Sequence, residues 1–333
     1  MNTNFYNIHG FIVAVEGPAN EIFLREYGWA IMDVKPRFIE TQLYIKPYAG
    51  TKNLPTKPPG SLKGMYLPFG ENERVLWYEK GCPLNHILSY CEALIFWPDK
   101  TFLHAGAVSK DGNAFIFAGA GNVGKTSIVL NLLKEGYEYL SDDWLLIGGD
   151  KVYSLPKPIH VFDYNLKNKK IAISVIGLKR LYYMPVFKIL EFGRKFSPHR
   201  YLRFAFESIK PMFRVDLKKI NRDAKCADFA NIFKIFYLER SDIGRIKVES
   251  DLTANELARR MAYVNLYEWH FIFREYYKYA YLYNVKNINI EKRFEHDFNI
   301  MYDAFRKASL QHVIIPSELD LTNVDINSFL NLN

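Results

Sequence analysis

One stretch of the chain has the residue types and spacing of a loop that holds phosphate groups. Residues 119–126 match the pattern G-x-x-x-x-G-K-[ST] at every defined position. Glycine permits backbone angles that side chains disfavour, so successive N–H groups can point at an anion. Lys125 can reach β- and γ-phosphate oxygens, and the Thr126 hydroxyl suits Mg²⁺. The residues expected to bind a nucleotide are Gly119, Ala120, Gly121, Asn122, Val123, Gly124, Lys125, Thr126 and Ser127.

The sequence around this loop predicts a strand before it and a helix after it. Residues 115–118 are apolar, and apolar side chains recur at helical spacing over 125–134. A helix that begins at Lys125 would direct the positive end of its dipole at the phosphates. A glycine-rich turn without a ligand is the alternative interpretation.

Two adjacent acids follow the next apolar segment. Asp142 and Asp143 lie between residues 139–140 and 144–147, both predicted as strands. A carboxylate at a strand end beside a phosphate loop commonly holds Mg²⁺, and a second acid is then available to accept a proton from an attacking hydroxyl. A solvated pair of turn acids is the alternative.

Over residues 103–147 the chain resembles HPr kinase/phosphorylase and its relatives. That family carries a His-small-x-x-Val segment, a P-loop, an Arg-Gly-His-type turn and an Ala-Asp-Asp pair at similar spacings. The corresponding segments here are 104–108, 119–126, 134–137 and 141–143. The resemblance implies an α/β fold with a P-loop nucleotide-binding core of the kind shared with phosphoenolpyruvate carboxykinase.

The resemblance also implies an activity, which is transfer of the γ-phosphoryl group of ATP to a hydroxyl, typically that of serine. Asp142 would act as the general base, and Asp143 would hold Mg²⁺ together with Thr126. Lys125 would neutralise charge on the β–γ bridge, and His104 would sit near the transferred phosphoryl group. A hydrogen-bonded histidine at a strand end is the alternative for His104.

The chain departs from that family downstream of the acids. The Leu-Glu-x-Arg-Gly segment of HPr kinases is missing, and residues 236–240 are only a partial echo that lies much further along. We therefore expect the acceptor to be a peptide, another protein, a metabolite or a glycan precursor, rather than HPr. A nucleotide-binding regulatory protein, or an ATPase without a dedicated acceptor, is the alternative function.

The organisation expected from the sequence is an N-terminal α/β subdomain over 1–98 and a P-loop domain over 99–333. The second domain would carry an insertion at about 170–228 and a helical, aromatic-rich C-terminal part. Glycine and proline positions and apolar periodicity mark the elements. Further strands are expected at 10–15, 38–45, 103–108, 113–118, 232–238 and 312–315, and helices at 21–27, 84–96, 252–283 and 288–308.

A basic, aromatic segment accounts for most of the excess positive charge. Residues 179–214 hold nine Lys and Arg against two Glu, with aromatic and aliphatic residues interleaved. The segment is interpreted as an ordinary helical insertion, a lid for an acidic substrate, or a contact with an anionic surface such as a membrane. Pro185 and Pro198 are expected to break any long helix here. A nucleic-acid partner is not expected, because no recognised binding motif is present.

Bulk properties set limits on the class of protein. The chain has 333 residues, 49% of them hydrophobic, and a net charge of +8. The three cysteines lack metal-ligand spacing, and so few argue against a disulfide framework. The N-terminus does not resemble a signal peptide, so we expect the protein to be cytoplasmic. The aromatic C-terminal helices could cover a homo-oligomer interface. For His160 and Asp163, we favour a surface strand and turn over a place in the site.

Overall fold

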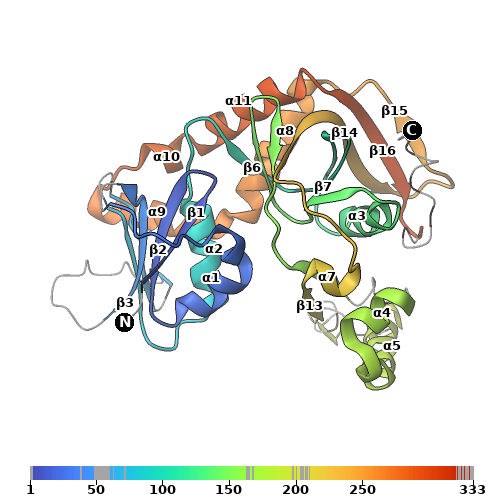
Figure 1. Ribbon diagram of the computed structural model, residues 1–333, viewed down its shortest axis with the longest axis horizontal. Helices are drawn as coiled ribbons and strands as arrows, with labels where there is room; N and C mark the ends of the chain where they lie inside the picture. The colour runs from blue at the N-terminus through green and yellow to red at the C-terminus, as the bar shows by residue number, and fades with distance from the viewer. Residues whose placement is uncertain are drawn as a thin grey trace.

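The computed structural model has a mixed α/β fold, in which two mixed sheets are joined by C-terminal helices (Figure 1). It describes residues 3–37, 40–48, 61, 62, 64–70, 73–162, 166, 169–196, 199, 201, 202, 206, 209, 211–319, 321, 324, 326 and 330. Asp163 and Pro198 lie outside the described residues. Within that described part of the chain, none of the helices has both the length and the apolar character needed to cross a bilayer.

The N-terminal unit is a five-stranded sheet of order β1-β2-β3-β5-β4, with two helices packed together beside it. A hairpin joins the first two strands, and its two turn residues, His9 and Gly10, both have positive φ, as a tight hairpin turn requires. The first strand was not predicted. The elements are β1 (Thr3–Ile8), β2 (Phe11–Glu16), α1 (Ala19–Tyr27), η1 (Gly28–Ala30), β3 (Leu43–Pro47), β4 (Met65–Tyr66), β5 (Val75–Tyr78) and α2 (Leu84–Leu94).

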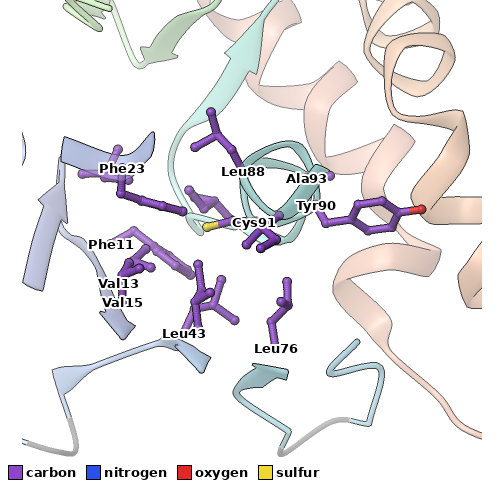
Figure 2. Packing of buried hydrophobic residues seen from close by; sticks show 14 of the residues in the cluster. Phe11, Val13, Val15, Phe23, Leu43, Leu76, Leu88, Tyr90, Cys91 and Ala93 are labelled. Carbon is purple, nitrogen blue, oxygen red and sulfur yellow. The ribbon is translucent and has the colours of Figure 1, made fainter. Parts of the chain in front are cut away.

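The core of this unit lies between the sheet and its helices. Figure 2 shows strand residues such as Val13 and Leu76 facing Phe23 of α1 and Cys91 of α2. The same core contains residues of a helix from the far end of the chain, α9 (His270–Tyr283), including Ile272 and Tyr276. The N-terminal unit is therefore completed by C-terminal sequence, which a division of the chain at residue 98 does not anticipate.

The larger sheet has nine strands, seven of them in the order β6-β10-β11-β14-β8-β7-β9. The long strand β14 runs parallel to β8 on one side and parallel to β16 on the other. Strands were expected over 103–108 and 113–118, and β7 and β8 form a hairpin there, in which Asp111 and Gly112 make the turn with positive φ. The strands are β6 (Thr101–Leu103), β7 (Ala105–Lys110), β8 (Asn113–Ala118), β9 (Glu138–Ser141), β10 (Leu145–Gly148), β11 (Lys151–Tyr153), β14 (Phe229–Ser241), β15 (Lys247–Glu249) and β16 (Ser309–Pro316).

Helices cover both faces of this sheet, because alternate residues of its strands point in opposite directions. On β8, Phe115 and Phe117 join the core beneath α3 (Lys125–Lys134), whereas Ile116 faces the C-terminal helices. The helix expected over 252–283 is interrupted at Trp269. The C-terminal helices other than α9 are α8 (Ala254–Glu268), α10 (Ile288–Glu291) and α11 (Arg293–Phe305).

A buried polar cluster fastens the sheet to α8 and α11 immediately before residue 104. Asp297 accepts hydrogen bonds from Thr101 at 2.6 Å, Arg293 at 3.0 Å and Asn265 at 3.1 Å. Asn265 also donates to the carbonyl of Phe102 at 2.7 Å. Asn265 Oδ1 is the one atom of these side chains that is buried without a hydrogen-bond partner among the described residues. The remaining hydrogen bonds hold the backbone of β6 in place as it leads to His104.

Two helices of the predicted insertion form a projection at the lower right of Figure 1. The prediction that Pro185 interrupts the helix was wrong, because α5 (Arg180–Phe196) continues through it. Pro185 lies in the second turn of the helix and has no N–H to donate to the carbonyl of Leu181. Because Leu181 is highly exposed, water can donate to that carbonyl instead. The other elements here are β12 (Ile159–Phe162), α4 (Lys169–Ile176), η4 (Gly177–Lys179), β13 (Met212–Val215) and α7 (Leu217–Ile220).

Candidate nucleotide-binding site

The loop between β8 and α3 has a backbone that only glycine permits at two positions. Gly119 has φ of 150°, and a Cβ there would lie 2.6 Å from the carbonyl oxygen of Leu238. Gly124 has φ of 111°, and its Cβ would lie 2.5 Å from Leu321. Between them, Gly121 and Asn122 are exposed, and Asn122 also has positive φ. The tip of the loop is thus open to solvent rather than covered by packed side chains.

Lys125 is the first residue of α3 and is folded back beneath this loop. Its Nζ donates to the carbonyls of Gly119 at 2.9 Å and Ala120 at 2.8 Å. Burial lowers the pKa of Lys125 to about 8, against the opposing effect of Asp143 and Asp142. A desolvated cation therefore lies at the base of an exposed loop, where an anionic ligand would be attracted strongly.

Asp142 is buried at the end of β9 and faces α3. Its Oδ2 accepts a hydrogen bond from the Thr126 hydroxyl at 3.1 Å, while its buried Oδ1 has no partner among the described residues. Burial, reinforced by the charge of Asp143, raises the pKa of Asp142 to about 7, although Thr126 and Lys125 oppose the shift. The site thus contains a buried carboxylate oxygen that makes no hydrogen bond to the described residues.

Asp143 points the other way, toward two histidines. Its oxygens lie 3.9 Å from Nε2 of His104 and 3.8 Å from Nδ1 of His160, and 45% of its side chain is exposed. Burial acts to raise the pKa of Asp143, but electrostatic interactions with the basic side chains of His104, His160 and Lys125 outweigh it and lower that pKa. Asp143 is therefore the ionised, accessible member of the acid pair.

His104 occupies the break between β6 and β7, where the chain leaves one strand partner for others. A single strand over 103–108 was expected, but β6 pairs with β10 and β7 pairs with β8 and β9. Burial, with the nearby charge of Lys125, lowers the pKa of His104 to about 4, so it is neutral at physiological pH. Its Nδ1 is buried without a hydrogen-bond partner in the described structure, and its ring packs edge-on against Trp144.

The structure brings together the site residues expected from the sequence, but the contacts of the two acids differ from those expected. We expected Thr126 to share Mg²⁺ with Asp143, whereas the Thr126 hydroxyl bonds to Asp142. The two acids lie in a bend after β9, where Asp142 faces α3 and Asp143 faces His104 and His160. His160 was expected to lie on a surface strand, yet β12 places it against Asp143. Among the described residues, no group of three or more His, Cys, Asp and Glu forms a metal site by itself.

A cleft of about 150 Å³ adjoins the acids, between them and the N-terminal unit. Two ion pairs cross it, Lys157 to Glu92 at 2.6 Å and Arg214 to Glu26 at 2.8 Å. Both acids belong to helices of the N-terminal unit, and both cations belong to the larger domain. These partly buried pairs fix one side of the cleft relative to Asp143.

Arg240 is a residue of the site that sequence reasoning set aside. Its guanidinium donates to the carbonyl of Val123 in the loop at 3.3 Å, and to those of Pro316 and Leu319 at 2.7 Å each. Parallel pairing of β14 with β8 aligns Tyr237 with Ala118, so residues just beyond them lie beside the loop. The partial match of residues 238–240 to Leu-Glu-x-Arg-Gly was the only hint of this in the sequence. It was set aside because these residues lie far along the chain from the loop, and the sequence alone does not show that β14 pairs with β8.

Comparison of the chain with models of known protein families gave no match, and comparison with individual curated proteins gave none.

Proposed function

We propose that the protein is an ATP-dependent kinase with a P-loop core of the HPr kinase and phosphoenolpyruvate carboxykinase type, transferring the γ-phosphoryl group to a hydroxyl. One observation carries the proposal. A buried Lys125, the Thr126–Asp142 pair and the exposed Asp143 converge at the end of a glycine-dependent loop. Phosphoryl transfer asks a protein mainly for positioning and for stabilisation of charge, and these groups supply both.

The donor set at Thr126 fits Mg²⁺ bound together with nucleotide phosphates. The unpartnered Oδ1 of Asp142 and the adjacent Thr126 hydroxyl are hard oxygen ligands. Mg²⁺ usually takes only one or two protein ligands and completes its shell with phosphate oxygens and water. When bound, it would neutralise charge on the phosphates. Its own charge would also favour the ionised form of Asp142, whose pKa is raised to about 7.

Asp143, rather than Asp142, is the residue we assign as proton acceptor. A general base must reach the hydroxyl from which it takes a proton, and Asp143 is half-exposed at the cleft whereas Asp142 is buried. The low pKa of Asp143 keeps it ionised, so it can orient the hydroxyl and take its proton. Lys125 holds the phosphates, and the cleft receives the acceptor, which carries a serine or another hydroxyl.

The experiment follows the γ-phosphate of radiolabelled ATP offered with serine-containing peptides and with pooled hydroxyl metabolites. Label should reach a hydroxyl acceptor, and Asp143→Asn should reduce transfer roughly 10²–10⁴-fold while ATP affinity stays close to that of the wild type. Asp251→Asn, an exposed acid outside the site, is the matched control.

Two outcomes would replace the kinase assignment. Release of label only to water, with every acceptor offered, would favour the ATPase. Binding of ATP without any turnover would favour a nucleotide-binding regulatory protein. Full transfer by Asp143→Asn would remove the role given to that acid.

A further inference from the structure

The helix α5 exposes an apolar face that no other described element covers. Its outward side chains are large and hydrophobic, and each is more than half exposed. With Leu178 just before the helix, they are Leu178 (90%), Leu181 (82%), Tyr182 (74%), Ile189 (65%), Phe192 (66%) and Phe196 (59%). Six side chains of this size present on the order of 800 Å² of apolar surface, above what monomers usually expose.

These residues share one side of the helix. At about 100° per residue, the five that belong to α5 fall within an arc of roughly 100°, the stripe expected of a surface-binding helix. The opposite side carries Phe187 and Leu190, which are buried in the core beneath α3, and Tyr183, which packs against it. Because that side already anchors α5 to the protein, the exposed stripe is not needed to hold the helix in place.

Basic residues border the stripe on both sides. Lys179 lies at one edge and Lys188 at the other, both exposed, and Glu191 is the only acid within α5. A hollow of about 660 Å³ is lined by Arg180, Leu181, Met184, Pro185 and Lys188. Cations next to exposed apolar side chains match a phosphate headgroup above acyl chains.

We propose that this face of α5 binds the surface of a bilayer that contains anionic phospholipid. The aromatic and aliphatic stripe enters the boundary between headgroups and acyl chains, and the lysines at its edges meet the lipid phosphates. Because α4 and α5 form the tip of a projection (Figure 1), the protein can dock in this way without covering the loop at 119–126.

Co-sedimentation of the full chain with vesicles tests this proposal. We expect binding to vesicles of phosphatidylcholine mixed with phosphatidylglycerol, weaker binding to phosphatidylcholine alone, and loss of binding as salt is raised. Phe192→Glu should weaken binding at least about tenfold, and Lys188→Gln about fivefold. Tyr281→Glu is the matched control, since Tyr281 is an aromatic residue on α9 that is even more exposed (87%) than Phe192, and its substitution should change nothing.

Three results would overturn the proposal. One is absence of wild-type binding to the anionic vesicles, which needs no variant to interpret. Another is equal, salt-insensitive binding to both kinds of vesicle, which would remove the role of charge. The last is a wild-type dimer that Phe192→Glu converts to a monomer in light scattering, which would make the face a contact between copies.

Discussion

Asp142→Asn should make the unliganded protein more stable, although it removes a charged residue from the proposed site. The pKa of Asp142 rises from its ordinary value of 3.8 to about 7 in the folded protein. The folded state therefore holds this proton more tightly than the unfolded state, and stability falls as pH rises from about 4 to about 7. Asparagine keeps an oxygen for the Thr126 hydroxyl but carries no charge.

The size of the effect follows from the shift. About three pKa units at 1.36 kcal/mol each set an upper limit of about 4 kcal/mol on the gain in unfolding free energy above pH 7. Because the charge of Asp143 contributes to the shift, we expect about 2–4 kcal/mol at pH 8 and little near pH 4.

Urea unfolding of the variant and the wild type at pH 5 and pH 8, without Mg²⁺ or nucleotide, measures this difference. Asp143→Asn is the control, because this substitution should lower the free energy of unfolding at neutral pH. The folded protein lowers the pKa of Asp143, so its carboxylate adds stability that is present at neutral pH and lost as pH falls through the lowered value. The reasoning is refuted if Asp142→Asn is the less stable protein at pH 8, or if its advantage does not grow between the two pH values.

Three further substitutions test the construction of the loop. Gly119→Ala places a Cβ 2.6 Å from the Leu238 carbonyl and should cost about 1–3 kcal/mol of unfolding free energy and weaken ATP binding, whereas Gly121→Ala meets no atom within 4 Å and should leave both unchanged. Urea unfolding and calorimetric titration with ATP measure both, and equal behaviour of the two variants would contradict the assigned backbone. Arg240→Met removes the donor to Val123, Pro316 and Leu319 and should cost about 1–3 kcal/mol, with weaker ATP binding measured in the same titration. Unchanged affinity would show that Arg240 does not support the loop.

Local patterns predicted the central part of the fold well. The helix expected over 125–134 is α3, and the Asp111-Gly112 turn joins the two expected strands. Both depend on neighbouring residues alone, since helix periodicity and positive-φ turns are local properties. The strand expected over 232–238 is present and extends in both directions as β14.

Features that depend on distant parts of the chain were not predictable in the same way. Arg240 reaches the site through the pairing of β14 with β8, and His160 reaches it because β12 packs near α3, contacts that the sequence does not indicate. The packing of α9 onto the N-terminal sheet requires a contact across most of the sequence. The sequence Asp142-Asp143 does not indicate which acid faces Thr126, because this depends on how the backbone bends after β9.

The most direct test of the account is calorimetric titration of ATP with Mg²⁺ into the wild type and into Lys125→Met, which keeps most of the length of the buried side chain and removes its charge. Lys125 is the loop's own cation, and its Nζ donates to the loop carbonyls of Gly119 and Ala120. We predict saturable binding to the wild type, weakened at least about tenfold in the variant, as expected for loss of one charge-assisted hydrogen bond. Absence of binding to the wild type, or equal affinity in a folded Lys125→Met protein, would contradict the claim that this loop holds nucleotide phosphates.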